Sequence, residues 1–140
     1  MGEKLSLEKI QRELSQHLEP GETLLVCGYG AIGVKSCYIG LSDRRLLLNE
    51  RTLRDESKGL EEIPLADIAE AQIKKPRLFP LDMYLAGLLM KQRRLWIRTH
   101  SGRRLEITLQ KLLPVKGNET VAERIMAELQ ARVPGLAQSS

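Results

Sequence analysis

Several kinds of residue are scarce in this chain, and each scarcity narrows the chemistry open to it. Only two cysteines, Cys27 and Cys37, and two histidines occur among 140 residues, with no Cys or His cluster around them. A disulfide scaffold and a zinc site are therefore disfavoured, and we expect two buried thiols and no bound metal. Aromatic residues make up 4% of the sequence, which leaves few stacking platforms for single-stranded nucleic acid.

Long apolar runs are also missing. No stretch reaches the roughly 18 to 20 apolar residues that a membrane-spanning helix needs. Charged residues are scattered through the first 20 positions, where a secretory signal requires an unbroken apolar segment. We therefore expect a cytoplasmic protein whose contact with a membrane, if it has one, is peripheral and at the inner face.

Catalytic constellations are not visible either. His17 and His100 have no spacing that links them to a cysteine or a carboxylate as a triad or a metal set. We expect a protein that is not an enzyme, with no catalytic residue and no small-molecule cofactor.

What is present indicates one globular domain. A chain of 140 residues with 42% hydrophobic and 29% charged residues is long enough to bury a single core. Apolar residues at helical spacing predict an amphipathic helix from Leu7 to Leu18, with Ser6 as its cap and Pro20 beyond its end.

Short aliphatic runs between turn residues then predict strands. The expected strands are residues 22–27, 35–41, 44–49, 61–65, 68–74, 94–99 and 103–109. A glycine-rich loop over 28–33 and a polar loop around 51–59 separate some of them. A last helix, capped by Asn118, carries an apolar stripe from Val121 to Leu129 and is closed by Pro134. One helix, about seven strands and one helix predict a mainly β fold, a small barrel or sandwich with flanking helices.

Three segments resemble a known family. They are Gly21-Glu22 before a strand, residues 38–48 with the sequence YIGLSDRRLLL, and residues 63–68 with the sequence IPLADI. Together they resemble the bacterial pleckstrin-homology-like and GRAM-type domains over roughly residues 20 to 132. The resemblance implies a seven-stranded, partly open barrel capped by a C-terminal helix, which binds a lipid, peptide or protein without catalysis. Family members that hold inositol phosphates carry basic residues around the first hairpin loop, whereas this loop has Lys35 alone beyond it.

The expected organisation is an N-terminal amphipathic helix (1–20), a pleckstrin-homology-like domain (21–134) and a disordered tail (135–140). The formal pattern Gly28-x-Gly30-x-x-Gly33 matches a dinucleotide fingerprint, but residues 34–41 do not read as the helix that a phosphate site requires. We therefore interpret this glycine-rich segment as a hairpin loop.

The most informative segment is the apolar stretch 78–90 between two of the predicted strands. Ten of its thirteen residues are hydrophobic, and from Lys74 to Arg104 nine basic residues stand against one acid, Asp82. Such a stretch is an insertion packed on the core, a protein interface, or a wedge that enters the headgroups of an anionic membrane. The candidate binding residues are Lys74, Lys75, Arg77, Phe79, Leu81, Tyr84, Leu85, Leu88, Leu89, Lys91, Arg93 and Arg94.

The sequence thus predicts a non-catalytic interaction module that binds a protein partner or an anionic lipid surface through this segment. The alternative is a homo-oligomeric scaffold domain. Nucleic acid is the least favoured partner, because Trp96 and Tyr84 alone interleave with the basic residues.

Overall fold

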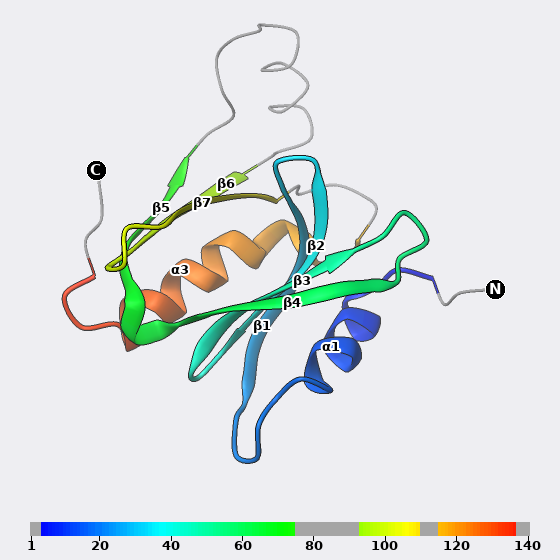
Figure 1. The fold of residues 1–140 in the computed structure, drawn as a ribbon, viewed down its shortest axis with the longest axis horizontal. Coiled ribbons are helices and arrows are strands. Elements are labelled where there is room, and N and C mark those ends of the chain that lie inside the picture. The colour runs from blue at the N-terminus through cyan, green and yellow to red at the C-terminus, as the bar shows by residue number, and fades with distance from the viewer. Residues whose placement is uncertain (1–3, 75–92, 110–114, 137–140) are drawn as a thin grey trace, which may run out of the picture.

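The computed structural model describes residues 4–74, 93–109 and 115–136. In this part of the chain, seven antiparallel strands form one sheet in the order β4-β3-β2-β1-β7-β6-β5, with a helix before them and another after them (Figure 1). The strands are β1 (Leu24–Ile32), β2 (Lys35–Ser42), β3 (Arg45–Arg51), β4 (Ser57–Pro64), β5 (Ile68–Lys74), β6 (Arg93–Thr99) and β7 (Arg104–Leu109). The helices are α1 (Leu7–Ser15) and α3 (Val121–Arg132), with short 3-10 turns η1 (Leu65–Asp67) and η2 (Asn118–Thr120). The expected mainly β class is confirmed.

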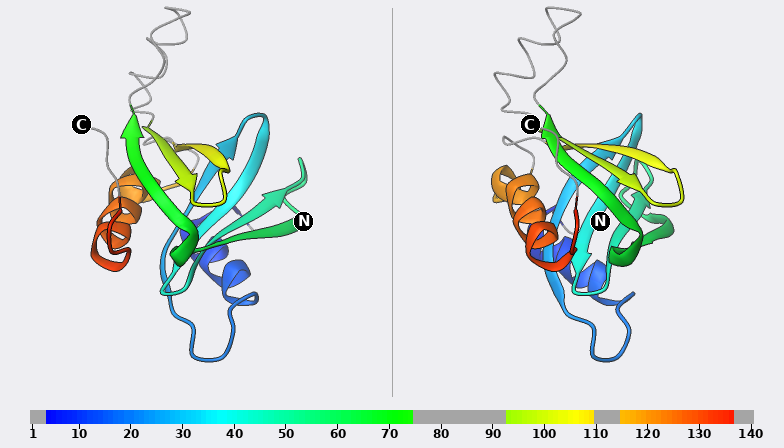
Figure 2. Two further views of the ribbon diagram at one scale, coloured as in Figure 1. Left: turned by 60° about the vertical axis from the view of Figure 1, so that its left-hand side comes forward. Right: turned by 90° about the vertical axis from the view of Figure 1, so that its left-hand side faces the viewer.

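The sheet is open and consists of two groups of strands joined through β1. This strand pairs with β2 along its whole length, whereas its pairing with β7, within the described residues, is limited to Gly30 and Ala31. The strands β4 and β5 are the two edges, and η1 connects them. Figure 2 shows β1–β4 and β5–β7 splayed apart at an angle. A strand such as β2, which has neighbours on both faces, is buried from Cys37 to Ser42.

The two helices cover opposite faces of the first group of strands. The apolar stripe of α3, at Val121, Ile125 and Leu129, joins the main core between the strand groups. Helix α1 contributes Ile10 and Leu14 to a second, smaller cluster with Tyr38 and Val115. Alternation along β2 explains the division, because Ile39 belongs to the main core and Tyr38 to the cluster under α1.

The prediction of a glycine-rich loop at 28–33 is wrong. Strand β1 continues through these residues to Ile32, and only Gly33 and Val34 form the turn, with φ of +62° at Gly33. Gly28 and Gly30 lie where neighbours approach the backbone closely: a Cβ on Gly28 would stand 2.6 Å from a methyl carbon of Val121. No helix begins after Gly33, so the context of a dinucleotide site is absent from this part of the chain.

Most other boundaries follow the prediction. Strand β5 occupies 68–74 as expected, and the inward residues of the β6–β7 hairpin, such as Leu95 and Ile107, are buried as their alternation predicts. Strand β4 begins at Ser57, four residues before the expected strand, so the polar loop shrinks to 52–56. The Ser6 side chain caps α1 by accepting a hydrogen bond from the Lys9 amide at 3.1 Å.

Asn118 does not cap a helix, contrary to the prediction. Its side-chain amide instead bonds to the backbone of Tyr29 in β1, accepting from the amide at 2.9 Å and donating to the carbonyl at 2.8 Å. Asn118 thus acts as a strand partner for β1 just beyond the point where pairing with β7 ends at Gly30. The short side chain of Asn118, with one donor and one acceptor, would suit a helix cap, but here it makes a tertiary contact.

The segment that carries the family resemblance builds the turn between β2 and β3. The Ser42 hydroxyl accepts from the Arg45 amide at 3.0 Å and donates to Glu22 at 2.5 Å. Arg45 is buried and donates twice to the Glu22 carboxylate at 2.9 Å and once to the His17 carbonyl at 2.8 Å. It also pairs with Glu62 of β4. The motif is therefore a structural ion-pair network that ties the start of β1 to the turn.

Candidate functional site

Three of the predicted binding residues lie within the described part of the chain, at the end of β5 and the start of β6. Lys74 of β5 and Arg94 of β6 are cross-strand partners, and Arg93 precedes Arg94 on β6. The other nine predicted residues, Lys75, Arg77, Phe79, Leu81, Tyr84, Leu85, Leu88, Leu89 and Lys91, lie outside the described residues.

The three described basic residues contact their own neighbours. The Lys74 ammonium lies 5.0 Å from the centre of the Trp96 ring. Arg94 pairs with Glu106 at 3.0 Å, and Arg93 pairs with Glu123 of α3 at 3.6 Å. Such partly exposed pairs are each worth at most about 1 kcal/mol, so an external anion can compete for these cations.

The register of the sheet brings this basic edge close to the turn between β1 and β2. A row across the strands runs from Lys74 to Arg94, then to Thr108 of β7 and Ala31 of β1. Three strand spacings of about 4.8 Å each put Lys74 roughly 14 Å from Ala31. Ala31 is in turn three residues before Val34 in the sequence. The end of β5, the start of β6 and the β1–β2 turn all lie at the top of the molecule in both views of Figure 2.

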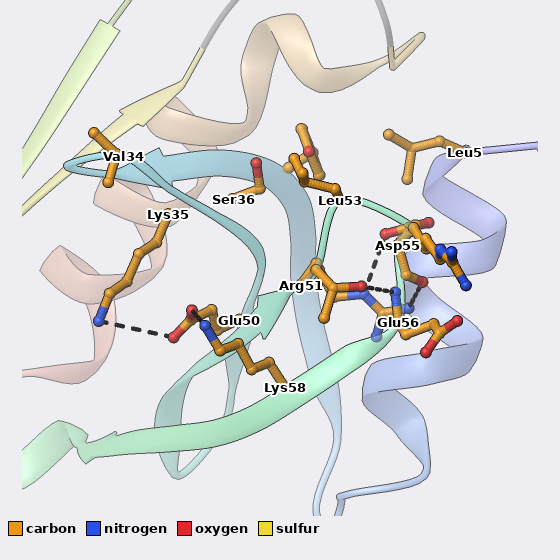
Figure 3. Close-up of a pocket in the computed structure, with 13 residues that line it drawn as sticks. Leu5, Val34, Lys35, Ser36, Glu50, Arg51, Leu53, Asp55, Glu56 and Lys58 are labelled. Atoms are coloured by element: carbon orange, nitrogen blue, oxygen red, sulfur yellow. Dashed lines mark hydrogen bonds and ion pairs between the residues drawn. The ribbon is translucent and has the colours of Figure 1, made fainter.

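Beside this turn is an open groove of about 1000 Å³, formed by the β1–β2 turn, the β3–β4 loop and the segment before α1 (Figure 3). We call it the hairpin groove. Its lining residues are Leu5, Tyr29, Val34, Lys35, Ser36, Glu50, Arg51, Thr52, Leu53, Arg54, Asp55, Glu56 and Lys58. The pairing of Ser36 with Arg51 places the β3–β4 loop directly beside the β1–β2 turn.

Two aliphatic side chains at the rim of the groove are fully exposed. Relative exposures are 102% for Val34, at the tip of the β1–β2 turn, and 109% for Leu53, in the β3–β4 loop. Burying one such side chain is worth about 1.5 to 3 kcal/mol. Two of them on neighbouring hairpin tips therefore form a site that gains free energy when an apolar phase covers it.

Basic side chains lie next to these tips. Lys35 follows Val34 directly and lies 3.8 Å from Glu50, which also pairs with Lys58 at 3.3 Å. Both lysines are largely exposed, and Arg54 follows Leu53 at the surface. With Glu56 also exposed in the β3–β4 loop, these three basic residues stand against two carboxylates, which leaves an excess of one positive charge at the rim.

The floor of the groove, by contrast, is an internally satisfied network around Asp55. Its carboxylate accepts from Lys9 at 2.8 Å, from the Tyr38 hydroxyl at 2.5 Å and from Arg51 at 3.1 Å. Burial alone raises the pKa of Asp55, but these three hydrogen bonds outweigh it and hold the pKa below its ordinary value. The Arg51 guanidinium also lies 4.0 Å from the centre of the Tyr38 ring. These polar groups are therefore structural.

Sequence reasoning missed the exposed pair Val34 and Leu53. Leu53 is an isolated leucine among polar residues in a loop, and this was the signal available. Val34 stood between the loop expected at 28–33 and the strand expected at 35–41, so its position at the tip of a two-residue turn was hidden.

Other chemistries gain no geometric support in the described residues. No group of three His, Cys, Asp or Glu side chains gathers there as a metal site. Cys37 is buried, Cys27 is partly buried and neither forms a disulfide; burial raises the pKa of Cys37 to about 11. Across these same residues, no helix combines the length and apolar character that crossing a bilayer demands.

Comparisons with known proteins show similarity of fold. No family model matches the chain, and no curated protein matches it significantly. It is similar to the crystal structure of the C-terminal domain of an unknown protein from Leishmania infantum, with a TM-score of 0.50 and 16% sequence identity. The alignment covers 89% of this chain and 94% of that one. At this identity the similarity shows a shared fold and carries no function.

Proposed function

We propose that this protein is a pleckstrin-homology-like interaction module that docks on an anionic membrane surface with the end that carries the hairpin groove. The exposed pair Val34 and Leu53 is the observation that supports the proposal most strongly. The open seven-stranded sheet with a C-terminal helix across its core is consistent with the pleckstrin-homology-like assignment.

The energetics suit a reversible attachment. Two inserted aliphatic side chains give roughly 3 to 6 kcal/mol, and each basic residue near an anionic surface adds about 1 kcal/mol. With Lys35, Arg54 and Lys74 near the surface, the gross gain is roughly 6 to 9 kcal/mol before the entropy of association is subtracted. Attachment of this strength weakens as salt screens the charges.

The apolar stretch 78–90 is part of the same proposal, because it connects Lys74 to Arg93. The described residues on either side of it, Lys74, Arg93 and Arg94, lie at the end of the sheet that also carries Val34. Phe79 and Leu85 are proposed to insert beside the hairpin tips.

Vesicle sedimentation tests the proposal. The protein should bind vesicles of phosphatidylserine and phosphatidylcholine and not vesicles of phosphatidylcholine alone. The variant Val34→Asp/Leu53→Asp should lose at least about tenfold in binding, because each change removes an inserted apolar group and adds a negative charge. Ala127→Asp, at an exposed position on α3, is the matched control and should bind like the unchanged protein.

A second variant, Phe79→Asp/Leu85→Asp, tests the predicted segment separately. A loss of vesicle binding with an unchanged thermal midpoint would support its insertion. Concentration-dependent mass in sedimentation velocity without any response to lipid would contradict the membrane proposal and favour a homo-oligomer. Unfolding of this variant would show that the stretch belongs to the core.

A further inference from the structure

Asp55 fixes the β3–β4 loop that carries Leu53, because it bonds both within the loop and to residues outside it. Its backbone has φ of +60°, a left-handed conformation that non-glycine residues adopt rarely. Within the loop, the Asp55 amide donates to the Thr52 carbonyl at 2.9 Å, and the Thr52 amide donates to the Glu56 carbonyl at 2.9 Å. Such a conformation persists when surrounding contacts outweigh its strain.

Those contacts come from three different elements. Arg51 at the end of β3 donates to the Asp55 carboxylate and also to its carbonyl at 2.5 Å. Tyr38 of β2 reaches the carboxylate through its hydroxyl at 2.5 Å. Arg51 and Tyr38 belong to the sheet and are buried, so they form a fixed base.

The third contact comes from outside the sheet. Lys9 of α1 is 46 residues before Asp55 in sequence, and its ammonium lies 2.8 Å from the carboxylate. The Lys9 side chain is only 9% exposed. Because the carboxylate shares its charge between Lys9 and Arg51, loss of Lys9 removes one of two cations that hold it in a partly desolvated site.

Helix α1 packs on the sheet away from the main core. Its buried apolar residues are Ile10 and Leu14, which pack in the smaller cluster and not in the main core. Leu14 meets the sheet above Gly40, where a Cβ would lie 2.8 Å from a Leu14 methyl carbon. An element with few buried residues opens more easily than the core strands.

We propose that α1 is a latch that sets the conformation of the β3–β4 loop through the Lys9–Asp55 pair. When α1 is seated, the loop keeps its left-handed residue and holds Leu53 and Arg54 at the rim of the hairpin groove. When α1 moves away, Asp55 loses its Lys9 partner and the loop loosens. Any partner that displaces α1 thereby changes the surface at the rim.

Hydrogen exchange of the loop amides tests the latch directly. Lys9→Met keeps most of the buried stem and removes the charge, and it should speed exchange at the Asp55 and Glu56 amides by about tenfold or more. Lys4→Met, at an exposed position before the helix, is the matched control and should leave these amides unchanged. Lys9→Arg restores a cation and should bring exchange back toward the rate of the unchanged protein.

Two results would overturn the latch. One is unchanged exchange in the loop of Lys9→Met; the other is an equal rise in the core strands β3 and β6, which would indicate a general loss of stability. Should Lys9→Met fail to fold, Lys9→Gln provides the test, because it also removes the cation but keeps a hydrogen-bond donor and leaves the contacts of Asp55 with Arg51 and Tyr38 in place.

The consequence for docking rests on the proposed function. If the loop must be ordered before Leu53 can insert, Lys9→Met should weaken binding to phosphatidylserine vesicles by about three- to tenfold. Failure of the unchanged protein to bind such vesicles would remove the docking proposal but leave the exchange result intact. Normal vesicle binding by a variant with a loosened loop would show that the latch does not control docking.

Discussion

The buried carboxylate of Glu22 should make the stability of this protein fall in acid by a predictable amount. Its side chain is 0% exposed and accepts two hydrogen bonds from Arg45, one from the Ser42 hydroxyl and one from the Glu19 amide. The hydrogen-bonded Arg45 guanidinium is the main cause that lowers the pKa of Glu22 from 4.5 to about 2, against the opposing effect of burial.

The direction and size of this loss of stability follow from the difference between the pKa values of Glu22 in the folded and unfolded states. Because the pKa of Glu22 is lower in the folded state, its contribution is complete well above pH 4.5 and is lost as pH falls toward 2. At 1.36 kcal/mol per pKa unit the full contribution is roughly 3 kcal/mol, and about 2 kcal/mol of it should be gone at pH 3. The substitution Glu22→Gln removes the titrating group and therefore this part of the pH dependence.

Urea unfolding at pH 6 and pH 3 measures the effect. The difference in unfolding free energy between the unchanged protein and Glu22→Gln should shrink by about 2 kcal/mol from pH 6 to pH 3. Glu19→Gln is the matched control: its side chain is 62% exposed and pairs with Arg44, so it should change stability by less than about 0.5 kcal/mol. A difference between the two proteins that stays constant across this range would refute the reasoning.

Two further predictions concern the contacts of the helices with the sheet. Gly40→Ala should lower the unfolding free energy by about 1 to 3 kcal/mol, because the added Cβ would meet Leu14. When Gly40→Ala and Leu14→Ala are combined, chemical denaturation should show a loss smaller than the sum of the two single losses, and strict additivity would contradict the contact. Asn118→Leu should cost about 2 to 3 kcal/mol and speed exchange at the Tyr29 amide, whereas a protected Tyr29 amide would show that the bond is dispensable.

The strands and helices could be predicted because their signals are local. Alternation of Leu95 and Ile97 with Trp96 and Arg98 predicted the β6–β7 hairpin, and helical spacing after Ser6 predicted α1. The glycines of β1 misled the prediction, because local propensity treats glycine as a loop residue. At Gly28 it instead provides room for Val121, a residue more than 90 positions away, and no local pattern contains that contact.

The site was harder to predict than the fold. The basic residues Lys74, Arg93 and Arg94 could be found as a charge pattern, and the sheet does bring them to one end. The hairpin groove depends on the pairing of Ser36 with Arg51, a register that sequence periodicity does not specify. The hydrogen bonds to the Asp55 carboxylate come from Lys9, Tyr38 and Arg51, which lie on three different elements. No local sequence pattern brings these residues together, so this network could be found only in the structure.

The most direct test of membrane docking is to identify which residues of the protein contact the lipid. With spin-labelled lipid in phosphatidylserine nanodiscs, the methyl NMR signals of Val34 and Leu53 should broaden strongly, while that of Ala127 on α3 should stay sharp. Strong broadening at Ala127 with sharp signals from Val34 and Leu53, or no broadening at any methyl group, would contradict the proposed docking surface.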